Sequence, residues 1–168
     1  MPIDQDILRQ LMATFREEMS ERMAAINAGL LALEQGAAGG QQTAILEELF
    51  RHVHSLKGAA RAVELKPIEQ LAHGIEDVFG AAKRDTIQIG APLFDLLYQG
   101  FDLIGAVMSG VEASQSPDLA LDIPGYLVRL AQAWRSQPID PPEIGMDESP
   151  ALPQQQVLTP LKPAAQPS

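Results

Sequence analysis

Apolar residues recur at every third or fourth position through most of the first 136 residues of the chain. Over residues 4–35 they form one continuous stripe made up of Ile7, Leu8, Leu11, Met12, Phe15, Met19, Met23, Ile26, Leu30 and Leu33. This spacing places side chains on one face of an α-helix, whereas a strand would need strict alternation. The stretch therefore predicts a long amphipathic helix, for which Asp4 is the expected N-cap.

The same spacing predicts four more helices. They are expected over about 42–63, from Pro67, from about Pro92, and over about 124–135, the last being shorter. Pro67 suits the first helical position because its missing N–H breaks no intrahelical bond there. The predicted fold class is all-α: an antiparallel four-helix bundle with an additional shorter C-terminal helix. The expected buried side of the second helix comprises Ile45, Leu46, Leu49, Phe50, Val53, Leu56, Ala60 and Val63.

The composition supports helices and divides the chain in two. Hydrophobic residues make up 46% of the chain but aromatic residues only 5%, a balance that favours packed helices over sheets. From residue 137 prolines become frequent and the apolar period is lost. We therefore expect a helical bundle over residues 1–136 and a Pro-rich, flexible and disordered linker over 137–168, which suggests the N-terminal part of a longer, multidomain protein.

The charge and the missing cysteines exclude several classes of function. A formal net charge of −10 argues against a nucleic-acid partner, because binding a phosphate backbone needs a basic face. With no cysteine in the chain there is no disulfide framework and no thiolate metal site or nucleophile. The N-terminus lacks the features of a signal peptide, and no apolar run approaches the roughly 20 residues that span a bilayer. We expect a monomeric cytoplasmic domain that does not insert into a membrane.

One strip of the second predicted helix gathers residues suited to phosphoryl chemistry. His54, Lys57, Gly58 and Arg61 lie at spacings i, i+3, i+4 and i+7, which form a strip beside the buried side. The two cations can offset phosphate charge, and the glycine leaves space for a partner. His52 points roughly 160° away from His54 at helical rotation, so we expect no chemical role for it.

The third predicted helix carries His73 and Glu76 at spacing i, i+3. His54 lies twelve residues before Lys66 and Glu76 lies ten residues after it, so an antiparallel hairpin with its turn near Lys66 brings them level. His54, His73 and Glu76 are also imidazole and carboxylate groups of the kind that zinc accepts, which leaves a small metal-binding bundle open as an alternative. Lys83 and Arg84, further on, are expected to form a solvated helix end.

Two segments resemble a known family. Residues 51–60, RHVHSLKGAA, resemble the phosphorylation motif H-S-[LI]-K-G of histidine phosphotransfer (HPt) domains. Residues 71–77, LAHGIED, resemble the H-x-x-E of the next helix in the N-terminal phosphotransfer domain of chemotaxis-type histidine kinases, the CheA family. The resemblance covers roughly residues 4–136 and implies an HPt-like bundle that serves in a phosphorelay.

The resemblance also implies roles for particular residues. His54 is then the phospho-accepting histidine, and Glu76, Lys57 and His73 belong to the hydrogen-bonding network around it. A carboxylate that accepts from Nδ1–H would fix the tautomer and leave Nε2 as the free lone pair. Gly58 and Arg61 would help to dock the partner. Arg61 and Glu64 stand where many relatives have a small residue or a glycine.

The chain lacks the motifs of a nucleotide-binding enzyme. It contains no G-x-x-x-x-G-K-[ST] loop, no G-x-G-x-x-G run and no nucleophile elbow. We therefore expect no cofactor and no kinase activity in this domain, with ATP and Mg²⁺ held by partner domains. The expected partners are a histidine kinase catalytic domain, in cis or in trans, and a response-regulator receiver domain.

Two alternatives stand beside the chemotaxis-type phosphorelay. The domain could be the transfer module of a hybrid sensor kinase outside chemotaxis, or it could be a helical scaffold without chemistry. A phosphorelay domain requires His54 to be partly exposed with Glu76 within hydrogen-bond reach, whereas a scaffold makes no such demand.

Overall fold

The computed structural model describes residues 5–112 and 121–137, and every regular element in these two ranges is an α-helix. The predicted all-α class is thereby confirmed. None of the described helices is long and apolar enough to cross a membrane. The helices are α1 (Gln5–Glu34), α2 (Gly39–Ala62), α3 (Lys66–Lys83), α4 (Ala91–Glu112) and α5 (Ile123–Arg135).

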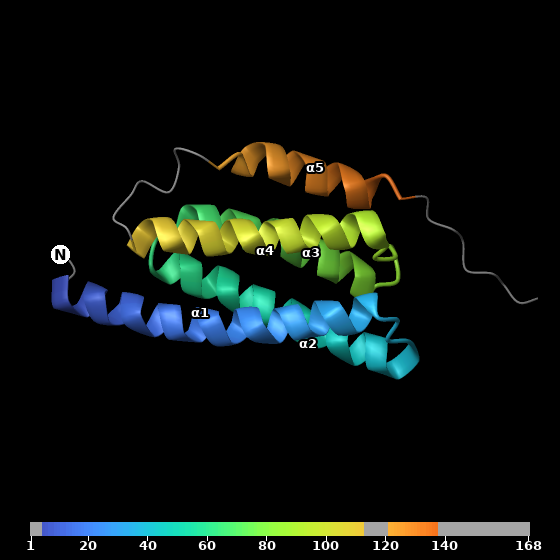
Figure 1. Ribbon diagram of the computed structural model, residues 1–168, viewed down its shortest axis with the longest axis horizontal. Coiled ribbons are helices and arrows are strands. Elements are labelled where there is room, and N and C mark those ends of the chain that lie inside the picture. Colours follow the sequence, from blue (N-terminus) through green and yellow to red (C-terminus); the bar gives the residue numbers. More distant parts are fainter. Residues whose placement is uncertain (1–4, 113–120, 138–168) are drawn as a thin grey trace, which may run out of the picture.

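The first four helices form the antiparallel bundle that the sequence predicts (Figure 1). Each of them packs on its neighbours in the order α1, α2, α3, α4, and α4 returns to contact α1. The most extensive packing is between α2 and α3. The shorter α5 lies outside this bundle, against α3 and α4.

The apolar stripes meet in one continuous core. Ile26, Leu49, Val53, Ile75 and Leu97 come from four different helices and have no exposed surface or almost none. Within the described part of the chain, the residues buried below the surface are hydrophobic or glycine, and none is charged. Burial of apolar surface is therefore the main stabilising contribution to the bundle.

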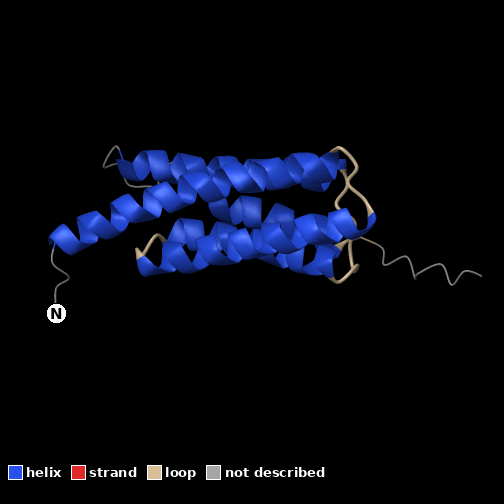
Figure 2. Ribbon diagram, turned by 90° about the horizontal axis from the view of Figure 1, so that it is seen from below, coloured by secondary structure: helices blue, strands red, loops and turns tan. Residues whose placement is uncertain are grey.

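The stripe of α1 is not buried along its whole length. Ile7 is 58% exposed and Leu11 is 39% exposed, whereas Phe15 and the later stripe residues are covered. Figure 2 shows the reason, because the N-terminal end of α1 extends past the helices beside it. The period therefore predicted the helix correctly but overestimated how much of it faces a partner helix.

The helix bounds differ from the predicted ones by up to three residues. α2 begins at Gly39 rather than near residue 42, and no side chain caps its first turn. α5 begins at Ile123, because the Asp122 carboxylate accepts a hydrogen bond of 2.9 Å from the Gly125 N–H and so caps the helix. Asp4, the predicted cap of α1, lies outside the described residues, as does the predicted linker from residue 138 onward.

A short turn joins α2 to α3. The Leu65 N–H donates to the Ala60 carbonyl at 2.9 Å and the Glu64 N–H donates to the Arg61 carbonyl at 3.1 Å, the two bonds of a Schellman motif. Glu64 takes the left-handed conformation (φ 60°) that glycine usually occupies in this motif. Pro67 follows within the first two positions of α3. Glu64 is one of the two residues that differ from the small residue or glycine of many relatives, and the turn forms without a glycine here.

Two glycines allow α5 to lie close to the bundle. A Cβ on Gly74 would lie 2.8 Å from Leu127 Cδ2, and a Cβ on Gly100 would overlap the hydroxyl of Tyr126. Tyr126 is fully buried and its hydroxyl donates to the Leu96 carbonyl at 2.9 Å. The missing side chains at 74 and 100 are therefore what lets α5 approach.

We expect Gly100→Ala to destabilise the fold by about 1–3 kcal/mol, because the added methyl group must displace Tyr126 from its hydrogen bond. Gly105→Ala on the same helix is the matched control, since no atom of the described residues outside its own stretch of helix lies within 4 Å of its Cβ position. That control should stabilise α4 by roughly 0.5–1 kcal/mol through lower backbone entropy in the unfolded chain. Urea unfolding measures both, and equal changes in the two variants would contradict the packing role of Gly100.

Candidate functional site

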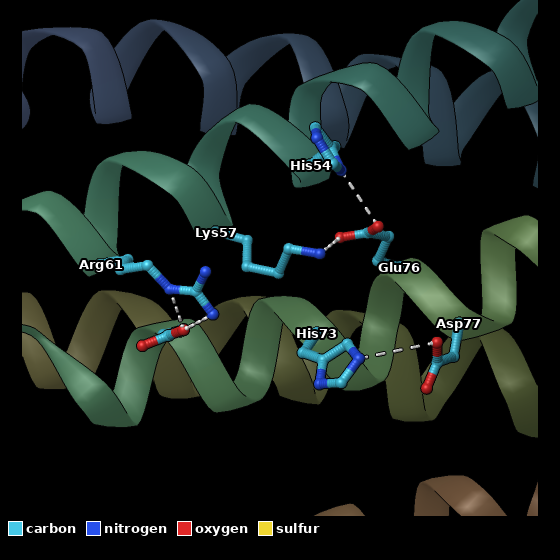
Figure 3. A network of polar contacts seen from close by, with 7 residues as sticks. His54, Lys57, Arg61, His73, Glu76 and Asp77 are labelled. Carbon is cyan, nitrogen blue, oxygen red and sulfur yellow. Dashed lines mark hydrogen bonds and ion pairs between the residues drawn. The ribbon is translucent and has the colours of Figure 1, made fainter.

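The structure brings His54 of α2 and Glu76 of α3 together. His54 Nδ1 and Glu76 Oε1 lie 3.1 Å apart, a hydrogen-bond distance (Figure 3). The two side chains differ in environment, because His54 is 62% exposed and Glu76 only 13%. The antiparallel packing of the two helices thus holds an exposed imidazole against a nearly buried carboxylate.

Lys57 makes the second contact with this carboxylate. Its Nζ lies 2.6 Å from Glu76 Oε2, in a close ion pair. Burial raises the pKa of Glu76, but the contacts with Lys57 and His54 lower it by more, so the pKa lies below its ordinary value. Glu76 is therefore ionised at neutral pH and acts only as an acceptor.

This arrangement determines the state of the His54 ring. An ionised Glu76 accepts a hydrogen bond from Nδ1–H, which selects the tautomer whose Nε2 carries the free lone pair. The ring is exposed, so an electrophile from solvent or from a partner can reach Nε2. The three residues together form an oriented imidazole nucleophile of the kind that covalent catalysis uses.

Gly58 and Arg61 lie further along α2. Gly58 is exposed, and beyond its own stretch of helix no atom of the described residues lies within 4 Å of its Cβ position, so the surface is open there. The Arg61 side chain is 75% exposed, and both its Nε and Nη2 lie 2.7 Å from Glu69 Oε1 on α3. Glu69 thus restrains Arg61, a pairing that the sequence analysis did not identify.

A groove of about 360 Å³ begins at Lys57 and runs beside these residues. It is lined by Lys57, Arg61, Lys66, Glu69, Gln70 and His73. The groove has three cationic side chains and one carboxylate, in a chain whose net charge is −10. It is therefore a local basic surface next to the exposed imidazole.

His73 was predicted to belong to the network around His54. In the structure its Nε2 lies 4.0 Å from Asp77 Oδ1, one turn further along α3 (Figure 3). The side chain is 65% exposed and borders the groove together with Lys57. Within the described residues, no hydrogen bond or ion pair joins His73 to His54, Lys57 or Glu76, so the structure does not bring it into that network, and the carboxylate it faces is Asp77.

Two further expectations from the sequence concern residues outside the motif. His52 lies with Glu18, Glu21 and Arg22 along a small hollow between α2 and α1, away from His54, as the helical rotation predicted. Lys83 was expected at a solvated helix end, and it is the exposed last residue of α3. Its Nζ lies 4.7 Å from the centre of the Phe50 ring and 3.7 Å from Glu47 Oε1.

Phe50 is the residue near the site that the sequence analysis missed. It was assigned to the buried side of α2, but its ring stacks on that of His54 with centroids 6.2 Å apart. The available signal was its spacing, since residues four apart on a helix are neighbours. The metal alternative gains no support, because no three His, Asp or Glu side chains of the described ranges are arranged to hold an ion.

Residues 10–113 match the family model of the Hpt domain. Among curated proteins, the chain is 28% identical over 131 residues to the chemotaxis protein CheA of Cereibacter sphaeroides, and 25% identical over 123 residues to that of Treponema pallidum. These alignments cover 78% and 70% of this chain. The chain spans only 18% and 15% of the length of those two relatives.

Two solved structures share the fold. The solution structure of the histidine phosphotransfer domain of CheA matches with a TM-score of 0.68 and 24% identity, over 76% of this chain and 94% of that one. The phosphorylated P1 domain of CheA3, crystallised in complex with CheY6 from R. sphaeroides, matches with a TM-score of 0.62 and 25% identity. That alignment covers 74% of this chain and 94% of the other.

The lowered pKa of Glu76 predicts a pH-dependent contribution to stability. A carboxyl group whose pKa is lower in the folded state stabilises the fold above its unfolded pKa, here about 4.5, and this contribution is lost as the pH falls through the folded value. Glu76→Gln should therefore lower the free energy of unfolding at pH 7 by up to about 1 kcal/mol. The difference from the wild type should shrink as the pH falls below about 4.5.

Urea unfolding across this pH range tests the prediction. Glu48→Gln, which removes an exposed carboxylate from α2, is the control and should lose less stability at pH 7. A difference between the wild type and Glu76→Gln that persists unchanged at pH 3 would show that the contribution is not one of charge.

Proposed function

This chain belongs to the Hpt domain family, and from that premise we propose that His54 receives a phosphoryl group from a histidine kinase and passes it to a response-regulator aspartate. One observation carries the proposal: an exposed imidazole has Nδ1 3.1 Å from a carboxylate that a lysine keeps ionised. The curated relatives are chemotaxis proteins, which favours the N-terminal domain of a CheA-type kinase over a transfer module outside chemotaxis.

Two partner domains are implied by this function. A kinase catalytic domain, in the same chain or another, binds ATP and Mg²⁺ and presents the γ-phosphoryl group to His54. A receiver domain then removes it, as suggested by the R. sphaeroides structure in which a phosphorylated P1 domain is bound to CheY6. The dependence on ATP favours a cytoplasmic location for the reaction.

The transfer consists of two displacement reactions at phosphorus. In the first, the Nε2 lone pair attacks the γ-phosphorus of ATP, an N–P bond forms, and the P–O bond to the departing ADP breaks. The ring then carries a positive charge, which Glu76 offsets through Nδ1–H. In the second, an aspartate oxygen of the receiver attacks the phosphorus, the N–P bond breaks, and Nε2 recovers its lone pair.

The surroundings of His54 suit both steps. Lys57 lies beside Glu76 and, one turn from His54, can offset charge on the phosphoryl oxygens. The open surface at Gly58 allows a partner to approach closely. The basic groove that includes Arg61 would attract the carboxylate-rich pocket of a receiver domain.

His54→Gln should abolish phosphorylation, because the amide has no nucleophilic nitrogen. The test incubates the chain with a CheA-type kinase catalytic domain, radiolabelled ATP and Mg²⁺, and then adds a receiver domain. The wild type should carry one label that is acid-labile and alkali-stable, as expected for a phosphoramidate, and the label should move to the receiver. His52→Gln is the control and should label normally. Labelling of His54→Gln, or its loss in a folded His52→Gln, would refute the assignment.

Glu76→Gln and Glu76→Ala should slow phosphorylation by roughly tenfold to thousandfold, the range for residues that orient a reacting group. The thermal midpoint should change little, since the carboxylate lies at the edge of the core. Rates of kinase-driven labelling and thermal unfolding are measured on the same samples. Wild-type rates in both variants would reject the orienting role, and a large fall in midpoint would identify Glu76 as a structural residue.

A further inference from the structure

The His54 ring needs more than the contact with Glu76 to hold one orientation. The side chain is 62% exposed, so little of its surface is packed. A hydrogen bond at Nδ1 fixes one point of the ring but leaves the plane free to swing about that point. Reaction at phosphorus depends on the direction of the Nε2 lone pair, so the plane of the ring matters to the rate.

Phe50 supplies a restraint on that plane. It lies one helical turn before His54 on α2, and the two ring planes differ by only 16°. Their centroids are 6.2 Å apart, within the range of offset aromatic pairs. Among the described residues, Phe50 is the aromatic side chain that is stacked with His54.

Phe50 is itself held by α3. Its Cε2 lies 3.5 Å from where a Cβ on Gly80 would be, an ordinary van der Waals distance, so the ring lies against α3 at this position. The Lys83 ammonium sits 4.7 Å from the centre of the ring and is also within 3.7 Å of Glu47. A cation at this distance is attracted to the ring face and restricts its movement.

We propose that Phe50 is a positioning residue for His54, which sets the plane of the imidazole so that Nδ1 meets Glu76 and Nε2 points outward. The importance of this for phosphoryl transfer rests on the function proposed above. Glu76 selects the tautomer through its contact with Nδ1, and Phe50 holds the ring in the plane that lets this contact form, so loss of Phe50 also weakens the selection of the tautomer. In the phosphorylated state the ring is cationic, and the same aromatic face would stabilise it.

Phe50→Leu removes the stacked ring but keeps an apolar side chain, and Phe50→Tyr keeps the ring. Nitrogen NMR of the His54 ring, without any phosphoryl donor, reports the fraction of the Nδ1–H tautomer. Kinase-driven labelling gives the rate. Phe50→Leu should lower the Nδ1–H fraction and slow labelling by about tenfold. Phe50→Tyr should retain both properties of the wild type.

Phe15→Leu is the matched control, because Phe15 is a buried core residue of α1, which carries none of the site residues. It should lower the urea midpoint without changing the tautomer fraction or the labelling rate. A wild-type tautomer fraction and rate in Phe50→Leu would overturn the proposal, as would an equal loss in Phe15→Leu. A wild-type chain that takes no label would instead refute the proposed function, and the NMR measurement would still decide the role of Phe50.

Discussion

The packing of α2 on α3 is the constraint on which the rest of the structure depends. Val53, Leu56 and Ile75 are fully buried, and they flank His54 and Glu76 in the sequence. Burial of one such side chain contributes about 1.5–3 kcal/mol, whereas an exposed ion pair contributes at most about 1 kcal/mol. The apolar residues therefore decide how the two helices lie, and the polar contacts form where that packing puts them. The polar contacts of the site contribute little to the stability of the fold.

The site also depends on a local reversal of charge. The chain carries a net charge of −10, yet the groove beside His54 presents Lys57, Arg61 and Lys66. Glu76 and Glu69 partly neutralise two of these cations and hold them in place. All of these side chains stand on helices rather than on loops, which keeps their spacing fixed. Such a surface keeps its shape and sign before any partner arrives, so little ordering is needed on binding.

The helical period of the apolar residues was enough to predict the helices and the fold. The nearly equal numbers of residues from His54 and from Glu76 to the turn were enough to predict that the two side chains lie opposite each other. What the sequence could not show depends on neighbours across helices. Phe50 packs against the core as its spacing predicted, but the spacing does not show that its ring also stacks on His54. Lys83 stands at the exposed end of α3 as expected, but its contact with Phe50 on α2 could not be read from the sequence. The exposure of Ile7 was missed because the period says nothing about where neighbouring helices end.

The turn at Glu64 fixes where α3 begins, so the number of residues from the turn to Glu76 decides the direction in which that side chain points. Each residue added to a helix rotates the residues after it by about 100° and advances them by about 1.5 Å. Substitution at Glu64 alters only local strain. One residue inserted within α3 between Leu71 and Ile75 would instead rotate Ile75 and Glu76 together relative to the buried Ile68 and Leu71. If the first half of α3 keeps its packing, Glu76 then turns away from His54 while every residue of the motif stays intact. The number of residues between the turn and Glu76 is thus as much a part of the site as the residues themselves.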